Sequence, residues 1–392
     1  MTDQHHAFYR PVRALDLPPI DRRALLAGDA DGVWIAPPGL PRHFTRAPPA
    51  FKDDPDGAGM FANDLGPCPV IYPPAFAVGA RDMRLVGYRT ILAANGQFFT
   101  DDPGDDATGF PAYLDRLAQT EDHFANEQTG LCRGDGGFAF IPGDRRTERI
   151  DGPALVLSST EPANYGSFLF RVLPKLAMFG SMPPDWPVLA HVAYRQYREL
   201  LELAGIAPAR IVPHDPAVIW HIGRAVIPGL RNPEGFLDDA SRGFYAALKV
   251  RIGLAGRADR RIYVSRLGLG GHGRRMLNEA ALEAALANKG FDIIRPHRMT
   301  AREQIAAFAN ARMVVGPSGA ALFNCVFCAP GTHLIDIESE PYWIHAHACL
   351  FTSCDLVWGV FEGKTTDQTV GVIHKPFTVN IPALLRRIAS FG

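Results

Sequence analysis

Short apolar strands alternate with helical segments along most of this chain, and no other sequence feature constrains its fold as strongly. The alternation runs from about residue 111 to 253 and begins again at 254. Such alternation predicts parallel sheets covered on both faces, with ligands at the carboxyl ends of the strands. The expected strands are 151–158, 188–192, 211–212, 225–227, 261–265, 291–294, 313–315, 334–337 and 356–361, and the expected helices are 113–127, 164–179, 194–204, 241–253, 278–288, 300–311 and 381–389.

Length and the change of pattern near residue 111 predict three parts. A chain of 392 residues exceeds what one hydrophobic core usually supports. Residues 1–110 are rich in proline, glycine and short β-prone runs, with a strong hairpin signal at Asn95-Gly96. We therefore expect an α/β protein with a β-rich N-terminal elaboration at 1–110, followed by two α/β units at 111–253 and 254–392.

Composition and charge argue against several classes of protein. Hydrophobic residues make up 47% of the chain and charged residues 21%, as in ordinary globular proteins. The formal net charge of -1 gives no basic field that would favour nucleic acid. No apolar run reaches the length of a bilayer span, and the first 20 residues lack the apolar core of a secretory signal. A cytoplasmic location is expected, and the sequence leaves the oligomeric state open.

The cysteines are too scattered for a disulfide framework in a chain of this length. Cys325 and Cys328 form CVFC, and His345 and His347 follow, so a zinc site is one interpretation. However, the sequence has no second CxxC, and CVFC continues an apolar segment in which cysteine packs as a small hydrophobe. We therefore expect core packing here and no metal site.

Arginines follow the expected strand at 261–265. Ser265-Arg266 stands at its end, and Arg274-Arg275 comes after the glycine-rich loop LGLGGHG. Guanidinium groups match the geometry of phosphate and keep their charge, so these arginines could clamp a diphosphate. A solvated loop with surface arginines is the alternative.

The stretch VVGPSGAALFN at 314–324 predicts a strand, a tight turn and the start of a helix. Gly316 and Gly319 would let the backbone approach a ligand, Ser318 offers a hydroxyl, and the helix N-terminus offers free N–H groups. The stretch is neither a Walker loop nor a dinucleotide fingerprint. A phosphate cradle and a simple chain reversal both remain open.

Alternate acids close the expected strand at 334–337, in the stretch LIDIE. Asp336 or Glu338 could accept hydrogen bonds from ribose hydroxyls, as acids at strand ends do in nucleotide-binding α/β units. General polar decoration beyond the sheet is the alternative.

The order of these motifs resembles the glycosyltransferase 61 family, whose bacterial members are often labelled capsular polysaccharide biosynthesis proteins. The resembling stretches are YVSR, RRMLNE, GF, a helix containing EQI, VVGPSGAALFN and FCAPGTHLIDIE, and upstream NYGSFLFRVLPKL. The resemblance covers about 150–365 and is most specific over 262–340.

This resemblance implies a GT-B architecture, in which two Rossmann-like domains face a cleft. It implies transfer of a sugar such as xylose or N-acetylglucosamine from a nucleotide-sugar donor to a glycan or polysaccharide acceptor, with inversion and without an obligatory metal or other cofactor. The donor would bind the C-terminal domain, with its diphosphate held by Arg266 and by Arg274 or Arg275 and its nucleoside met by Asp336 or Glu338. The helix after the arginine loop would be ordered by Asn278 and Glu279, and the floor of the donor site would be shaped by Gly316, Ser318, Gly319 and Asn324. The acceptor-side element would comprise Asn164, Tyr165, Ser167, Arg171 and Lys175.

Three positions depart from the family pattern. Ser167 and Ser318 stand where relatives usually or often have histidine, and Arg171 stands where they usually have aspartate. An inverting transfer needs a base to deprotonate the acceptor hydroxyl, and histidine suits that task near neutral pH. The base is therefore unassigned. The candidates in or near expected cleft loops are Glu161, Asp185, His221 and His272, of which His221 could equally be a core histidine.

Three functions compete on this sequence. The first is an active inverting glycosyltransferase. The second is a nucleotide- or glycan-binding protein that keeps the scaffold without catalysis, a hypothesis motivated by Ser167, Arg171 and Ser318. The third is a sugar-nucleotide epimerase with similar α/β layers, which would convert its ligand without any acceptor.

Overall fold

The computed structural model describes residues 8–37, 43–59, 65–72, 74–104, 109–117, 131–134, 137–140, 146–178, 185–232, 235–254, 258–270, 274–340, 344–365 and 374–392. The chain forms two compact α/β units. Unit 1 comprises Met1–Pro41 and Pro73–Arg231, and unit 2 comprises Arg42–Tyr72 and Asn232–Gly392. The three-part division expected from the sequence, with boundaries near 110 and 253, stays a prediction.

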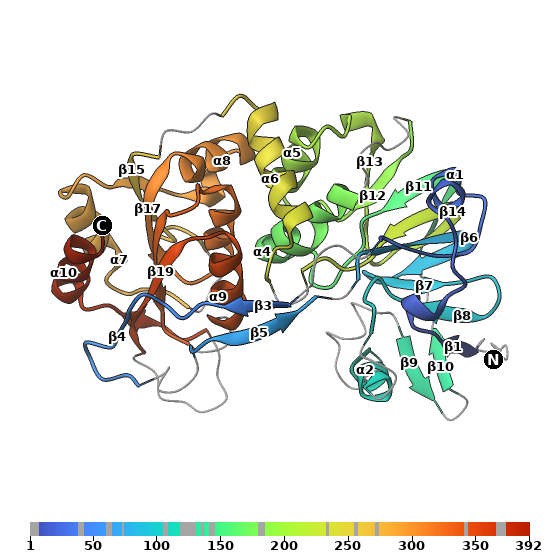
Figure 1. Ribbon diagram of the computed structural model, residues 1–392, viewed down its shortest axis with the longest axis horizontal. Helices are drawn as coiled ribbons and strands as arrows, with labels where there is room; N and C mark the ends of the chain where they lie inside the picture. The colour runs from blue at the N-terminus through green and yellow to red at the C-terminus, as the bar shows by residue number, and fades with distance from the viewer. Residues whose placement is uncertain are drawn as a thin grey trace. The chain divides into compact units, whose positions relative to one another are not determined.

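Unit 1 is built on one large mixed sheet (Figure 1). Its parallel part has the order β13-β12-β11-β14, and the sheet continues through β6, β7, β8, β1, β10 and β9, with β2 paired to β6. The strands are β1 Phe8–Pro11, β2 Gly32–Ile35, β6 Phe76–Val86, β7 Thr90–Leu92, β8 Gln97–Phe99, β9 Leu131–Gly134, β10 Gly137–Phe140, β11 Thr147–Val156, β12 Val188–Ala190, β13 Ile211–Pro213 and β14 Ile219–Pro228. The helices are η1 Ala14–Asp16, α1 Arg22–Ala27, α2 Phe110–Leu117, α4 Tyr165–Ser167, η2 Phe168–Val172, η3 Leu173–Met178, α5 Arg195–Leu203 and η4 Pro208–Arg210.

The local signals in this unit acted as expected in most places. The Asn95-Gly96 hairpin is confirmed: it joins β7 to β8, and Gly96 takes the left-handed conformation at φ 77°. The helix expected at 113–127 begins earlier, at Phe110, and residues 118–130 lie outside the described part of the chain. Buried side chains of β6, β11 and β14 form the main core, including Val78, Val156 and Ile227.

The helix expected over 164–179 changes pitch twice. Asn164 caps it by accepting the N–H groups of Gly166 and Ser167, and the chain then passes from α-helix through the π-helical turn η2 to the 3₁₀ helix η3. Pro174 lacks the N–H that a regular helix would use at this point, which accounts for the end of the wide π turn. Single π turns often occur at functional sites, and this one carries Arg171.

Unit 2 contains a wholly parallel six-stranded sheet of order β16-β15-β17-β18-β19-β4 (Figure 1). Its strands are β4 Lys52–Asp53, β15 Arg260–Val264, β16 Asp292–Ile294, β17 Ala311–Pro317, β18 His333–Glu338 and β19 Val357–Glu362. Two further pairs are β3 His43–Arg46 with β5 Cys68–Ile71, and β20 Lys364–Thr365 with β21 Phe377–Thr378. The helices are α6 Asp239–Arg251, α7 Glu279–Ala287, η5 Pro296–Arg298, α8 Ala301–Ala309, η6 Ala320–Phe327, α9 Ile344–Ser353 and α10 Ile381–Phe391.

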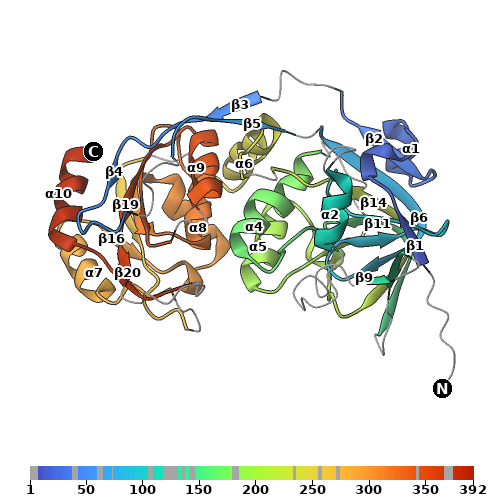
Figure 2. The ribbon, with the colours of Figure 1, turned by 90° about the horizontal axis from the view of Figure 1, so that it is seen from below.

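Helices cover both faces of this parallel sheet, as the alternating pattern predicted. Figure 2 shows α7 and α10 on one side and α8 and α9 on the other. On the first side, Leu282 and Leu286 of α7 and Leu384 of α10 pack on buried strand residues. The capping box of α8 is confirmed, since Thr300 and Glu303 bond each other's backbone N–H groups.

Two features of unit 2 differ from the sequence-based expectation. The segment after VVGPSG is the 3₁₀ helix η6, and α9 was not expected as a helix at all. Cys325 and Cys328 are buried, as the packing interpretation expected. None of the helices in the described ranges is long and apolar enough to cross a bilayer.

Candidate functional site

The carboxyl edge of the unit 2 sheet gathers the donor-site residues expected from the sequence. The strand order reverses between β15 and β17, because β16 lies on one side of β15 and β17 to β19 lie on the other. Loops that leave two neighbouring strands in opposite directions open a crevice, and ligands of α/β sheets bind at such points. Ser265-Arg266 follows β15 here, and Ser318-Gly319 follows β17.

Two arginines converge at this crevice on one backbone carbonyl. The Ser318 oxygen accepts from Nη1 of Arg266 at 3.2 Å and from Nη2 of Arg274 at 2.8 Å. A Cβ added at Gly319 would lie 3.6 Å from a guanidinium nitrogen of each arginine. Both cations therefore lie against the backbone of Gly319. Arg275 is exposed. The structure thus separates Arg274 from Arg275, which the sequence could not do.

The charge around the two arginines is unevenly balanced. Arg274 pairs with Glu338 at 3.3 Å, whereas no carboxylate of the described residues lies within ion-pair distance of the Arg266 guanidinium. Burial, and then the neighbouring Arg274 charge, lower the pKa of Arg266 to about 10. An anion bound beside Arg266 would raise this pKa again, because an opposite charge stabilises the protonated guanidinium.

Two polar side chains at the start of α7, Asn278 and Glu279, bond the segments around this crevice. Glu279 accepts from the Arg266 N–H at 2.7 Å and from the Tyr263 hydroxyl at 3.2 Å, and burial raises the pKa of Glu279. Asn278 bonds both the carbonyl (2.8 Å) and the N–H (3.1 Å) of Val379. Glu279 therefore holds the arginine loop through the Arg266 N–H, and Asn278 ties the start of α7 to Val379.

Packing against neighbouring elements shapes the turn after β17. A Cβ at Gly316 would lie 2.9 Å from Cβ of Val264, so β17 needs a glycine here to lie close to β15. The buried Asn324 donates to Gln304 at 2.9 Å and braces η6 against α8. Ser318 presents its carbonyl to the arginines, while its hydroxyl lies 3.3 Å from Nδ1 of His347.

His347 belongs to a buried cluster with the two acids at the end of β18. Its Nδ1 lies 2.7 Å from Oδ2 of Asp336, and Oε1 of Glu338 accepts the N–H groups of Ser339 and Glu340. One potential ligand atom from each of Asp336, Glu338 and His347 falls within 4.8 Å of the others, so the three could hold a cation. Burial and then Asp336 raise the pKa of Glu338. Either Asp336 or Glu338 was expected to meet the nucleoside, and both carboxylates are fully buried in this structure.

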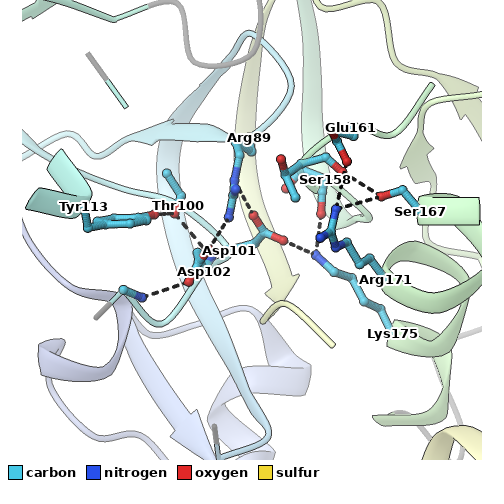
Figure 3. Close-up of polar contacts among 12 residues, drawn as sticks. Arg89, Thr100, Asp101, Asp102, Tyr113, Ser158, Glu161, Ser167, Arg171 and Lys175 are labelled. Atoms are coloured by element: carbon cyan, nitrogen blue, oxygen red, sulfur yellow. Dashed lines mark hydrogen bonds and ion pairs between the residues drawn. The ribbon is translucent and has the colours of Figure 1, made fainter. Parts of the chain in front are cut away.

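The carboxyl edge of the unit 1 sheet carries a second polar cluster (Figure 3). Lys175 and Asp101 are both 0% exposed; Nζ of Lys175 donates to Oδ2 of Asp101 at 2.6 Å and to the Ser158 carbonyl. Arg89 donates to the other carboxylate oxygen of Asp101 at 2.9 Å. Burial alone would raise the pKa of Asp101, but Arg89 and Lys175 hold it below its usual value, while burial lowers the pKa of Lys175. The group is a closed ion network.

Glu161, Arg171 and Ser167 lie beside this network (Figure 3). Nη1 of Arg171 donates to Oε2 of Glu161 at 3.1 Å and lies 3.4 Å from the Ser167 hydroxyl, which itself donates to the Thr160 carbonyl. Tyr165 stacks on Tyr197 at 5.9 Å between ring centroids. The acceptor-side element of the sequence analysis thus contributes to two adjoining charge groups, through Lys175 and Arg171.

The four candidate bases fall in different places. Glu161 follows β11 at the carboxyl edge, whereas Asp185 precedes β12 and lies toward the amino edge. His221 pairs with Arg149 near the start of β11 and β14, and burial followed by the Arg84 charge lowers its pKa. His272 lies outside the described residues.

Sequence reasoning missed several residues of the two edges. Arg89 and Asp101 stand in residues 1–110, where the sequence predicted no site residue, and His347 was considered only for zinc. His191 and His214 directly follow β12 and β13, and a polar residue at the end of each predicted strand was the signal available. Burial lowers the pKa of His191, and burial and then His191 lower that of His214 to about 4.

Residues 165–335 match the family model described as Glycosyltransferase 61. This segment is a glycosyltransferase 61 domain. It begins at α4, contains Arg171, Lys175, Arg266, Arg274 and Ser318, and ends within β18, one residue before Asp336. The domain makes the chain a glycosyl-transfer enzyme, as the resemblance implied. No curated protein matches this chain.

Proposed function

We propose that this glycosyltransferase 61 protein takes a sugar from a nucleoside-diphosphate donor and transfers it with inversion to a glycan or polysaccharide acceptor. The arrangement proposed for its two units is GT-B. A xylose or N-acetylglucosamine donor, expected from the family resemblance, is part of this proposal. The proposed transfer reaction requires no metal.

The observation that carries the proposal is the convergence of Arg266 and Arg274 on the Ser318 carbonyl. The two guanidinium groups stand at the point where the strand order reverses, and Glu338 pairs with Arg274 there. Such a site favours a ligand with two adjacent negative charges, and a diphosphate has them. Developing charge on the leaving diphosphate would be stabilised by the same groups.

A nucleotide screen tests the proposal. UDP, GDP, CDP and TDP, and then their sugar conjugates, are titrated against the protein while its melting temperature and the dissociation constant are measured. We expect one nucleoside diphosphate to raise the melting temperature, because a ligand that binds only the folded state stabilises it. Transfer activity is then followed as release of that diphosphate in the presence of glycan acceptors.

Three variants locate the binding site. Arg266→Ala and Arg274→Ala should each weaken nucleoside-diphosphate binding by about tenfold or more, as loss of a hydrogen bond to a charged group does. Arg275→Ala, at an exposed neighbour, is the matched control and should change the dissociation constant by less than about twofold. Equal affinity in the Arg266→Ala variant and the wild type would refute the assignment, and binding of no nucleotide at all would refute the function.

A further inference from the structure

An inverting transfer requires a group that accepts the proton of the acceptor hydroxyl, and this section rests on the function proposed above. Ligands of α/β units gather at the carboxyl edge of their parallel strands. In unit 1 the strand order reverses between β11 and β14, since β12 and β13 lie on the far side of β11. A base presented by this unit is therefore sought in the loops that follow those two strands.

Position removes two of the sequence-based candidates. His221 is the third residue of β14 and pairs with Arg149, so five residues separate it from Val226, the partner of Leu155 near the carboxyl end of β11. That separation is roughly 16 Å along a strand. Asp185 precedes β12 and so lies at its amino end. Only Glu161, among the candidates in the described ranges, follows a parallel strand at its carboxyl end.

The two histidines at this edge present no reachable lone pair. Nδ1 of His191 lies 3.2 Å from the His214 carbonyl, which can only accept, so Nδ1 carries the proton and Nε2 the lone pair. The Nε2 atoms of both His191 and His214 are buried. An acceptor hydroxyl outside the unit cannot contact either atom.

The neighbouring acids are committed to cations. Both oxygens of Asp101 bond to buried cations, Arg89 and Lys175, and Asp102 pairs with Arg89 at 3.3 Å while accepting the Gly104 N–H at 3.0 Å. Glu161 differs from them, because its side chain is 33% exposed and, among the described residues, only its Oε2 is hydrogen-bonded. Its other carboxylate oxygen is available to a substrate.

The backbone of Glu161 is held in an unusual conformation. Its φ is 47°, in the left-handed region that non-glycine residues seldom occupy. Its carbonyl accepts the Asn164 N–H at 3.0 Å, which closes the turn that leads into α4. Strained residues persist where the surrounding structure fixes them, and they concentrate at functional sites.

Arg171 fixes the direction of the carboxylate. Its guanidinium bonds Oε2 at 3.1 Å, lies over the Phe170 ring at 4.7 Å, and is itself only 18% exposed. Burial is the largest influence on this guanidinium and lowers its pKa, and Arg89 and Asp102 act on it from the adjoining network. The Arg171 guanidinium thus holds one carboxylate oxygen of Glu161, and the other oxygen accepts no hydrogen bond from the described residues.

We propose that Glu161 is the general base of the transfer reaction and that Arg171 is its positioning residue. The acceptor hydroxyl gives its proton to the second carboxylate oxygen of Glu161 as the acceptor oxygen bonds to the anomeric carbon. The bond between that carbon and the diphosphate oxygen breaks, and its electron pair leaves with the diphosphate. Glu161 then releases the proton to water.

The test compares Glu161→Gln with Asp215→Asn, using the nucleotide sugar found in the screen and following release of nucleoside diphosphate. Asp215 is the matched control because it is an exposed acid that follows β13 at the same edge. We expect Glu161→Gln to lower kcat by about 100-fold or more while the dissociation constant of the nucleoside diphosphate changes less than twofold. Asp215→Asn should keep kcat within about twofold. We expect kcat/KM of the wild type to fall as the pH is lowered, and we expect this fall, the acid limb of the pH profile, to be absent from Glu161→Gln.

Glu161→Gly distinguishes a loss of turnover from a loss of stability. Glycine accepts the left-handed conformation without strain, so the melting temperature should not fall by more than a few degrees while turnover is lost. Wild-type kcat in Glu161→Gln, or an unchanged acid limb, would overturn the assignment of the base and leave the transferase function intact. A wild-type protein that binds a nucleoside diphosphate but turns over no donor would overturn both.

Discussion

Strand β11 of unit 1 and strand β15 of unit 2 end in loops of opposite chemical character. Glu161 follows β11 and Arg266 follows β15, both where the strand order of their sheet reverses. Around Glu161 the buried charges already pair with one another, through Lys175, Asp101 and Arg89. Around Arg266 they do not: Arg266 and Arg274 share the Ser318 carbonyl, and of the two, within the described part of the chain, Arg274 alone pairs with a carboxylate, that of Glu338. Similar topology therefore supports a network of mutually paired charges in unit 1 and a site with excess positive charge, suited to an anion, in unit 2.

Removal of the Lys175 cation should have the largest effect on stability of the changes considered for the two edges. Lys175→Met takes the cation from a fully buried pair and leaves Asp101 with Arg89 alone, which should lower the free energy of unfolding by about 3–5 kcal/mol. Arg275→Met, at an exposed arginine of the other unit, is the control and should change it by less than about 0.5 kcal/mol. Urea unfolding measures both. A loss below about 1 kcal/mol for Lys175→Met would show that the network does not depend on its cation.

Acid should destabilise the edge of unit 1 through His214. Its pKa is lowered from 6.5 to about 4 mainly by burial, so the unfolded chain takes up a proton below about pH 6.5 and the folded chain does so only near pH 4. The free energy of unfolding should therefore fall as the pH is lowered through this window, by about 3 kcal/mol in total.

A variant isolates that contribution from other groups that titrate in acid. His214→Asn keeps an N–H donor at this position and removes the titration, so its stability should depend less steeply on pH between 6.5 and 4. Parallel curves for wild type and His214→Asn would contradict the buried neutral state of this imidazole.

Replacement of Arg266 by lysine tests whether the carboxyl edge of unit 2 binds its anion through the charge alone or through the guanidinium geometry. Lysine keeps the charge but loses the planar fork, so the affinity for nucleoside diphosphate should fall by about tenfold, or about 1.4 kcal/mol. Isothermal titration measures the change, with Arg275→Lys as the control at an exposed position. If Arg266→Lys binds as tightly as the wild type, a point charge suffices and the guanidinium geometry has no role.

The sequence predicted the parts of both edges that depend on local pattern. Apolar runs marked β15 and β17, and strand ends meet at one edge of a parallel sheet, so Arg266 and Ser318 could be placed together in advance. It could not place His347 beside Ser318, because the two lie 29 residues apart and α9 was not recognised as a helix. Nor could it assemble Arg89, Asp101 and Lys175, since a hairpin, a loop and a 3₁₀ helix each supply one of them. Such clusters depend on tertiary packing, which period and spacing do not encode.

Ser318 should have the smallest effect, although its position departs from the family pattern. The carbonyl of Ser318 meets the arginines, and a side-chain substitution leaves that carbonyl in place. The hydroxyl instead lies by His347 in the buried cluster, so Ser318→Ala should cost about 0.5–1.5 kcal/mol of stability. The dissociation constant for nucleoside diphosphate should change by less than about twofold. A Ser318→Ala variant that keeps its stability but loses binding would mean that the Ser318 hydroxyl, and not its carbonyl, faces the donor. The contrast between the two edges would then depend on the side chains of Arg266 and Arg274 alone.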